Sequence, residues 1–345
     1  MKFLIRLKKN RNLQLTNMRI PETFKLREKV RHQVDPLPDV TWTANRVDEF
    51  RVVKKLPIRR RLIDRLSPYI VNWKQNQFTK TVKTKLNASY NLLCVGERFM
   101  RGTFENRIRQ HARDVESVLV QGCGFGDKEV HRWLRRGVKS VAGIELMNYE
   151  SCWEKTAPML NEAFGADVGF KQASVDDIPY GDGEFDVTSS SAVYEHVYRL
   201  KEASRESARI LRQGGFLIHS IGPLYYCFGG DHCIATYGQD AGYDHLLLPE
   251  EEYRRRISDR NVFDLSPDPI CNFWAENDRL SFARFREYLD VFDELFDVSF
   301  MLLVICDQAL AFRDQHPSKW QQMLDMGLDE EDLLVKAIHG IWKKK

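Results

Sequence analysis

Three glycines stand at alternate positions directly after a short apolar run. The run is Val118-Leu119-Val120, and Gly122, Gly124 and Gly126 follow it before a predicted helix. Glycine permits a tight turn and lets the backbone come close to a ligand, while the N–H groups at the start of the helix favour an anion. Glu145 ends the next apolar run 19 residues later, where a carboxylate can accept hydrogen bonds from both hydroxyls of a ribose. The spacing predicts a cofactor site for either a dinucleotide or S-adenosylmethionine.

Three more motifs follow the glycine loop along the chain. They are residues 174–180, residues 182–187 with Glu195-His196-Val197 behind them, and residues 209–216. Together with the loop they resemble the class I S-adenosylmethionine-dependent methyltransferases, especially the group known as methyltransferase domain 11. That group typically has V-L-D-x-G-C-G-x-G at the loop, D-x-x-F-D-x-V before E-H-V, and R-x-L-x-P-G-G before its fifth strand. The resemblance implies a methyltransferase whose cofactor is S-adenosyl-L-methionine.

The same resemblance implies which residues contact the cofactor. They belong to the glycine loop, the end of the second strand, the segment before the fourth strand and the end of that strand: Gly122, Cys123, Gly124, Gly126, Glu145, Leu146, Ser174, Val175, Ser190 and Ser191. Val120 and Ser174 depart from the family pattern, because both replace an acid that is usual there. A serine can still accept a hydrogen bond from the adenine amino group, whereas Val120 leaves the methionine ammonium to another residue.

Three histidines are candidates for catalytic proton transfer. His232 and His245 each follow an aspartate, in Asp231-His232 and Asp244-His245, and His196 belongs to the E-H-V motif. Methyl transfer to a hydroxyl needs a base, and histidine titrates near neutral pH. Two other interpretations stay open: the aspartates and histidines could hold a divalent metal ion, or the histidines could be structural residues of a folded lid. The spacing matches no metal motif, so we predict no metal site.

Residues 222–280 interrupt the regular succession of strands and helices, and they are rich in Gly, Tyr, His and Asp. Parts of this insert, with residues 332–334, are loosely similar to methyltransferases found with surface-glycan biosynthesis, which implies O-methylation of a sugar or glycolipid hydroxyl. Aromatic side chains such as Tyr225 and Tyr243 suit a sugar pocket. The alternatives are a methyltransferase of RNA or another nucleic acid, and a cofactor-binding subunit without catalytic activity. Against the nucleic-acid alternative, the N-P-P-[YF] tetrapeptide of amino-methylating enzymes does not occur.

Strands and helices alternate through most of the chain. Strands are expected at residues 118–120, 140–144, 168–171, 185–188 and 216–218, with helices at 128–136, 150–164 and 198–212 between them. Such alternation predicts a parallel sheet covered by helices on both faces. Two further strands near 300–305 and 337–342 would complete an α/β fold with a Rossmann-like, seven-stranded, mostly parallel sheet and an antiparallel edge strand. The methyltransferase domain is expected to span residues 86–345.

Positive charge is concentrated in the N-terminal quarter. Residues 1–85 hold 22 Lys and Arg against 7 Asp and Glu, whereas the remaining chain holds 30 against 42. We expect a basic, mostly helical extension over residues 1–85, which either meets an anionic partner or packs on the acidic body of its own chain. Residues 1–20 mix basic and apolar side chains and are expected to contact an anionic membrane surface. With no secretory signal, membrane span or paired cysteine motif, a cytoplasmic protein at the membrane periphery is predicted.

Overall fold

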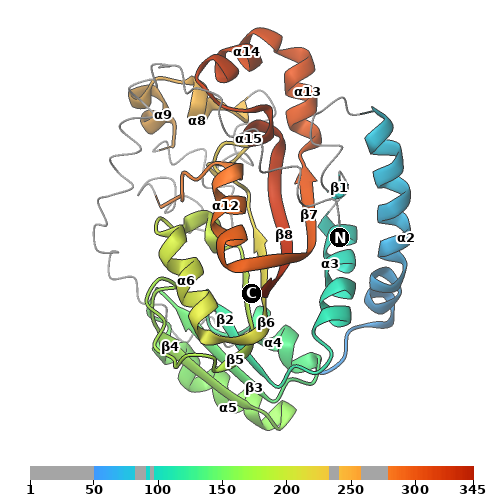
Figure 1. Cartoon of the computed structure of the whole chain (residues 1–345), viewed down its shortest axis with the longest axis vertical. Coiled ribbons are helices and arrows are strands. Elements are labelled where there is room, and N and C mark those ends of the chain that lie inside the picture. The colour runs from blue at the N-terminus through green and yellow to red at the C-terminus, as the bar shows by residue number, and fades with distance from the viewer. Residues whose placement is uncertain (1–49, 82–90, 94–96, 233–240, 258–278) are drawn as a thin grey trace.

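The short apolar runs form the strands of one eight-stranded sheet (Figure 1). The computed structural model describes residues 50–81, 91–93, 97–232, 241–257 and 279–345. The strands are β1 (Asn91–Leu93), β2 (Ser117–Gln121), β3 (Ser140–Glu145), β4 (Asp167–Gln172), β5 (Phe185–Ser191), β6 (Leu211–Ile221), β7 (Phe296–Ile305) and β8 (Val335–Lys344). Their order is β1-β7-β8-β6-β5-β2-β3-β4, and β8 alone among these described strands runs antiparallel to its neighbours.

The predicted Rossmann-like, mostly parallel sheet is confirmed. β2 to β8 are the seven expected strands, and β1 adds an eighth that pairs with β7 in parallel. The antiparallel strand is β8, which lies between β6 and β7 and not at the edge. Its side chains explain this place, because Ile338, Ile341 and Trp342 are fully buried and an interior strand is covered on both faces.

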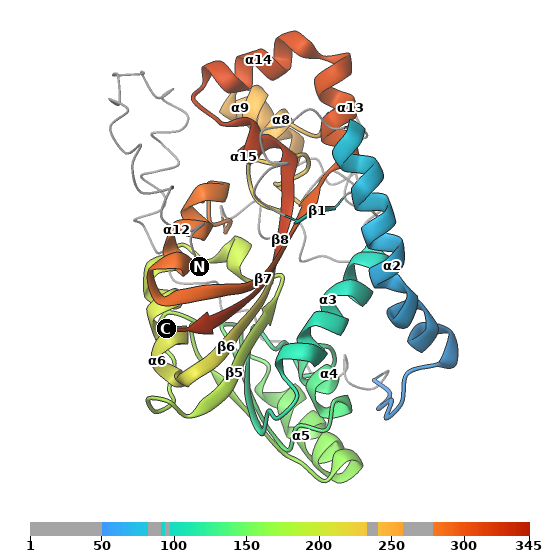
Figure 2. The ribbon, with the colours of Figure 1, turned by 45° about the vertical axis from the view of Figure 1, so that its right-hand side comes forward.

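Helices pack on both faces of the sheet (Figure 2). The helices are α2 (Ile58–Thr81), α3 (Glu97–His111), α4 (Glu129–Arg135), α5 (Glu150–Phe164), η4 (Tyr194–His196), α6 (Leu200–Ile210), α8 (Asp244–Leu247), α9 (Glu250–Ile257), α12 (Phe285–Leu295), α13 (Asp307–Gln315), α14 (Pro317–Asp325) and α15 (Glu330–Leu334). On one face, Trp133 of α4 and Leu160 of α5 pack with Val120 of β2. On the other, Phe292 of α12 packs with Leu217 of β6.

The described part of the insert after β6 contributes aromatic side chains to the core. Tyr225, Tyr226, Phe228 and Tyr243 are each less than a tenth exposed and pack in one cluster with Trp320 of α14. Figure 1 shows α8, α9, α13, α14 and α15 gathered at one end of the sheet. The aromatic residues that the sequence suggested for a sugar pocket therefore stabilise this end of the molecule.

Two prolines have opposite effects on their helices. α2 continues through Pro68, although proline offers no N–H to the carbonyl of Asp64. The side chain of Asn106, on α3, donates a hydrogen bond to that carbonyl and so replaces the missing donor. Pro317 instead begins α14 directly after α13 ends, since the residue before a proline, His316, is biased away from helix.

Candidate functional site

The glycine loop between β2 and α4 has a backbone conformation that glycine adopts readily and other residues rarely. The φ angle is +68° at Gly122, +52° at Gly124 and +93° at Gly126. A Cβ atom at Gly122 would lie 2.2 Å from Val193 Cγ2, so that position is closed to a side chain. A Cβ atom at Gly124 would meet no described atom within 4 Å. The backbone of Gly124 is therefore open to a ligand.

The carboxylate of Glu145 connects the end of β3 to this loop. Its Oε2 accepts a hydrogen bond from the N–H of Gly124 at 3.0 Å, and its Oε1 accepts from Leu146 at 2.9 Å and Met147 at 3.3 Å. Burial raises the pKa of Glu145, and the three N–H donors act in the opposite direction. The carboxylate is thus held beside the loop with lone pairs left for the hydroxyls of a ligand.

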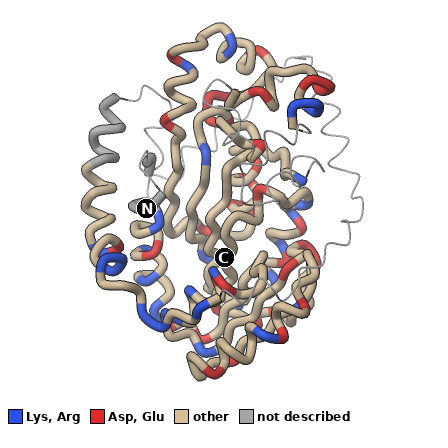
Figure 3. Tube along the Cα trace, turned by 180° about the vertical axis from the view of Figure 1, so that it is seen from behind, with Lys and Arg blue, Asp and Glu red and all other residues tan. Residues whose placement is uncertain are grey.

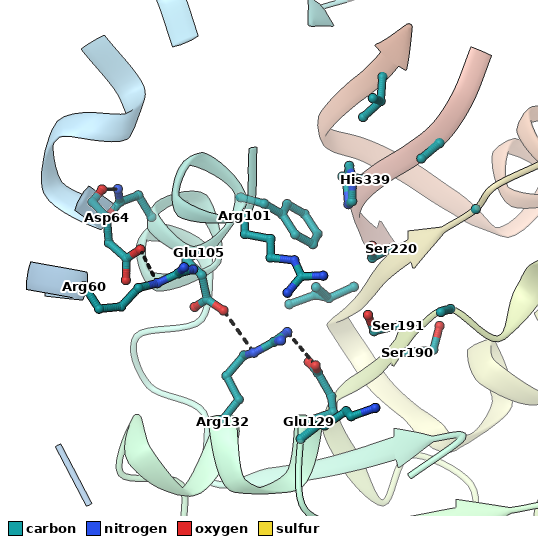
Figure 4. A pocket seen from close by; sticks show the side chains of 18 of the residues that line it. Arg60, Asp64, Arg101, Glu105, Glu129, Arg132, Ser190, Ser191, Ser220 and His339 are labelled. Carbon is teal, nitrogen blue, oxygen red and sulfur yellow. Dashed lines mark hydrogen bonds and ion pairs between the residues drawn. The ribbon is translucent and has the colours of Figure 1, made fainter. Parts of the chain in front are cut away.

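A cavity of about 1840 Å³ lies beyond the carboxyl ends of the central strands. Six of the ten expected cofactor residues line it: Gly122, Cys123, Gly124, Glu145, Ser190 and Ser191. Figure 4 shows Ser190 and Ser191 at the end of β5, facing the helices across the cavity. The chain changes direction here, because β3 and β4 lie on one side of β2 and β5 and β6 on the other. Open α/β sheets bind their ligands at such a switch point.

The other four expected cofactor residues lie outside the cavity lining. Gly126 is buried, and the side chain of Leu146 is 45% exposed. Ser174 Oγ donates a hydrogen bond to the Asp176 carboxylate, and Val175 packs against the core. Their contact with the cofactor stays a prediction.

No side chain at the end of β2 takes over the role of the acid that the family pattern has at position 120. Val120 is fully buried in the core. The amide of the next residue, Gln121, donates to Ser207 Oγ at 2.9 Å and accepts from the Tyr194 hydroxyl at 3.0 Å. Both side chains are therefore engaged inside the protein, so the methionine ammonium would be bound elsewhere in the cavity.

None of the three histidines proposed for catalysis lines the cavity. The rings of His196 and His232 lie 5.0 Å apart, and His196 Nδ1 is 2.8 Å from the carbonyl oxygen of Arg279. His245 Nε2 lies 2.8 Å from the carbonyl oxygen of Tyr225. Burial lowers the pKa of His196 to about 3. These contacts fit the structural interpretation better than the catalytic one, although the catalytic assignments stay untested predictions.

The aspartates beside these histidines already have partners. The Tyr253 hydroxyl donates to Asp231 Oδ2 at 3.1 Å, and Asp244 forms an ion pair with Arg256. In the part of the chain that the structure describes, no cluster of three or more His, Cys, Asp or Glu is arranged to bind a metal ion.

One histidine that the sequence did not single out does line the cavity. His339 lies on β8 opposite Ser220 of β6, with its ring centroid 5.3 Å from that of Phe104. Neither ring nitrogen has a hydrogen-bond partner among the described residues. Burial, with a smaller contribution from the charge of Arg101, lowers the pKa of His339 to about 4. A neutral imidazole therefore faces the cavity at pH 7.

Charged side chains of α2, α3 and α4 form the opposite wall (Figure 4). Glu105 pairs with Arg132 at 3.1 Å and with Arg136, and Arg132 also reaches Glu129 at 2.5 Å. Arg101, Glu105 and Arg109 follow one another at intervals of four residues, which places them on one face of α3. That spacing is visible in the sequence, although it belongs to none of the cofactor motifs.

The E-H-V motif contains a buried acid. Glu195 is 1% exposed, and neither carboxylate oxygen has a hydrogen-bond partner of adequate geometry among the described residues. Burial raises the pKa of Glu195 to about 8, against a smaller opposing effect of nearby backbone N–H groups. The carboxyl group is therefore mostly protonated at pH 7 in the folded protein.

The fold and the site define a Rossmann-like α/β protein with a nucleotide loop at the switch point of its sheet. Residues 119–219 match the family described as methyltransferase domain. This stretch of the chain is therefore similar to the class I S-adenosylmethionine-dependent methyltransferases, as the motifs predicted.

Curated relatives match part of the chain. Sarcosine/dimethylglycine N-methyltransferase of Halorhodospira halochloris is 31% identical over 103 residues, 29% of this chain and 36% of that protein. The ubiquinone/menaquinone biosynthesis C-methyltransferase UbiE of Bdellovibrio bacteriovorus is 28% identical over 145 residues, 41% and 58% of the two chains. The chain thus matches about a third and just over half of their lengths. The crystal structure of geranyl diphosphate C-methyltransferase from Streptomyces coelicolor A3(2) aligns with a TM-score of 0.43 and 14% identity, over 72% and 82% of the chains.

Proposed function

We propose that the protein is an S-adenosyl-L-methionine-dependent methyltransferase. The observation that carries this proposal is the glycine loop and Glu145 at the wall of one cavity, inside the residues that match the methyltransferase family. These groups suit the cofactor, because Gly124 borders space that a side chain would fill and Glu145 offers a carboxylate to the ribose hydroxyls. When bound, S-adenosylmethionine supplies a methyl group activated by a positively charged sulfur.

The residues of the cavity would align the acceptor and receive its proton. A lone pair of the acceptor forms the bond to the methyl carbon while the carbon–sulfur bond breaks, and the thioether product leaves neutral. His339 is the group best placed to take the acceptor proton, since it lines the cavity, is neutral at pH 7 and has unpaired ring nitrogens among the described residues.

The cavity of about 1840 Å³ is large enough to hold a small-molecule acceptor together with the cofactor. A sugar or glycolipid hydroxyl was inferred in part from the aromatic residues of the insert. Tyr225 and Tyr243 are buried in the core, so they do not support a sugar pocket. The curated relatives named above are N- and C-methyltransferases. Oxygen, nitrogen and carbon acceptors are therefore all included in the test.

Calorimetric titration of the full chain with S-adenosylmethionine and S-adenosylhomocysteine is the first measurement, and saturable binding of both is expected. Methyl transfer is then measured with a panel of sugars, nucleotide sugars, amines, carboxylic acids, phenols that accept a methyl group on a ring carbon, and RNA. Absence of cofactor binding by the folded protein would refute the proposal. Cofactor binding without turnover of any acceptor would favour the non-catalytic subunit, and turnover of RNA alone would favour the nucleic-acid methyltransferase.

His339→Gln tests the route of the proton once an acceptor is known. The variant should turn over about 10²–10⁴-fold more slowly and bind the cofactor normally, because only the proton acceptor is lost. His111→Gln is the control, since this histidine lies on α3 outside the cavity lining and bonds to the Arg107 carbonyl. Normal turnover of His339→Gln would return the role to His232, His245 or His196, whose alanine variants are tested in the same assay.

We also propose that the basic N-terminal segment contacts an anionic membrane. Residues 1–20 lie outside the described residues, but α2 presents an exposed apolar stripe beside its arginines: Ile58, Leu62, Leu66, Tyr69 and Trp73. Basic amphipathic segments of this kind bind anionic lipid surfaces. No described helix is both long enough and apolar enough to cross a bilayer.

Deleting residues 2–20 should abolish binding to phosphatidylserine vesicles and spare turnover of a soluble acceptor. Unchanged vesicle binding would contradict the proposed membrane contact.

A further inference from the structure

The wall of the cavity formed by α2, α3 and α4 carries more positive charge than its own acids can neutralise. Twelve Lys and Arg and six Asp and Glu line the cavity. The acids closest to this wall are already paired, Asp64 with Arg60 at 3.1 Å, and Glu105 and Glu129 with Arg132. Figure 3 shows Lys and Arg at the beginning of α2 and in the segment that leads into it. The excess of positive charge therefore lies on the side of the cavity that α2, α3 and α4 form.

Two arginines of this wall lack a partner among the described residues: Arg135 an ion pair, and Arg136 a hydrogen bond to Nη1. Arg136 pairs with Glu105 through Nη2, but its Nη1 is buried and without a hydrogen-bond partner among the described residues. Arg135 has no ion pair in the described part of the chain, and burial together with the charge of Arg132 lowers its pKa. A buried N–H without an acceptor is costly, and a bound anion would give Arg136 Nη1 an acceptor and Arg135 an opposite charge.

Building on the proposed methyltransferase function, we propose that this wall binds a phosphate or diphosphate group of the methyl acceptor. A carboxylate needs a single bidentate arginine, whereas Arg101, Arg109, Arg135 and Arg136 together offer donors for the several oxygens and higher charge of a phosphate. The acceptor's reactive atom would then lie between this wall and Ser190 and Ser191, on the side of the cofactor loop.

The arrangement also couples anion binding to proton transfer. Arg101 lies close enough to lower the pKa of His339. A phosphate beside Arg101 would offset that charge and make the imidazole a better base at the moment when an acceptor is bound. An acceptor without the anionic group would lose both its anchor and this increase in basicity.

Inorganic pyrophosphate is the probe, titrated by calorimetry into the full chain saturated with S-adenosylhomocysteine. Arg101→Gln and Arg135→Gln should each weaken pyrophosphate binding by at least about tenfold, because each removes a charge-assisted donor. Arg205→Gln is the matched control, since this exposed arginine of α6 lies outside the cavity lining and, among the described residues, forms a long ion pair of 3.9 Å with Glu294. S-adenosylhomocysteine affinity should be the same in all variants.

Removal of Arg135 relieves repulsion from Arg132, so Arg135→Gln should weaken anion binding without lowering the unfolding midpoint. Pyrophosphate binding that is absent, or equally strong in all variants, would overturn the proposal. Tighter binding of an RNA oligonucleotide than of pyrophosphate, dependent on the same arginines, would also overturn the proposal. The wall would then be a binding surface for a nucleic acid and not for a phosphorylated small molecule. If the wild type does not bind S-adenosylhomocysteine, the proposed function itself is refuted. The S-adenosylhomocysteine titration therefore distinguishes failure of the proposed function from failure of the anion site.

Discussion

At the scale of single residues, Glu145 performs two tasks with one carboxylate. It accepts three backbone N–H groups, from Gly124, Leu146 and Met147, and it lines the cavity. The glycine loop is therefore held in shape by the same group that the resemblance assigns to the ribose. Substitutions at this position affect both tasks, so each test needs a control for the loop.

We predict that Glu145→Gln weakens cofactor binding by about one to two orders of magnitude, because a charge-assisted acceptor for two hydroxyls is lost. Since burial raises the pKa of Glu145, wild-type affinity should fall on acidification at a pH above the ordinary glutamate range, and the variant should lack this dependence. Calorimetry at several pH values measures both. Glu184→Gln is the control, because this exposed glutamate accepts the Gly181 N–H at 2.6 Å far from the cavity. Unchanged affinity would rule out the ribose assignment.

Gly124→Val should also abolish most cofactor binding, because the side chain would enter open space at the cavity wall. Backbone strain alone could lower stability at a φ of +52°, so Gly165→Val is the control. Gly165 has a φ of +57° and open space around its Cβ position, but it ends α5 outside the cavity. Both variants should lose similar stability, and only Gly124→Val should lose cofactor affinity. Equal cofactor binding in the two would contradict the assignment of the loop.

At the scale of elements, the joint between α2 and α3 builds the basic wall. Gly102 makes the close approach possible, because a Cβ atom there would lie 2.2 Å from Ser67 Oγ. Asn106 supplies the donor that Pro68 cannot. α2, the described helix of the predicted basic extension, thus packs on α3, and Asp64 and Arg60 line the cavity.

Asn106→Leu should lower the free energy of unfolding by about 1–3 kcal/mol, because the Asp64 carbonyl would be left without a donor in a partly buried place. Urea titration followed by circular dichroism measures the loss. Gln321→Leu, on the exposed surface of α14, removes an amide that bonds only within its own helix to Asp325 and should change stability by less than about 0.5 kcal/mol. Equal effects of the two substitutions would show that α2 does not depend on Asn106.

At the scale of the whole molecule, the sheet brings together residues that are far apart in the chain. β5 and β6 place Ser190 and Ser220 beside the glycine loop, and β8 inserts His339 next to Ser220. The same close packing buries Glu195 beneath the insert, where Ser281 N–H bonds to its carbonyl oxygen at 2.7 Å. Global stability should therefore depend on the protonation of this one acid.

The raised pKa of Glu195 predicts a direction for that dependence. Between pH 4.5 and about 8 the folded protein holds a proton that the unfolded chain has lost, so stability should be highest at the acidic end and fall as the pH rises to about 8. Glu195→Gln keeps the shape without the charge, so it should remove this slope and add about 3 kcal/mol at pH 7. Urea titrations across this pH range, with Glu184→Gln as the exposed control, test it. If the free energy of unfolding depends on pH in the same way in the wild type and in Glu195→Gln, ionisation of this carboxyl group does not destabilise the fold.

The sequence by itself determined the fold class and the core of the cofactor loop. Strand, glycines, helix and Glu145 lie within one short stretch of chain, and each obeys a local rule: apolar runs form buried strands, and glycine permits positive φ. The family motifs then extended this assignment to Ser190 and Ser191, which do line the cavity.

Only the tertiary structure decided which of the remaining polar residues face the cavity. His196, His232 and His245 looked equally suitable in the sequence, yet they are packed away from it, whereas His339 faces it. That outcome depends on the register of β8 against β6, which pairs His339 with Ser220, and a shift of one residue would turn the side chain to the other face of the sheet. Register between strands more than 100 residues apart is set by the packing of the whole core, which no local pattern contains.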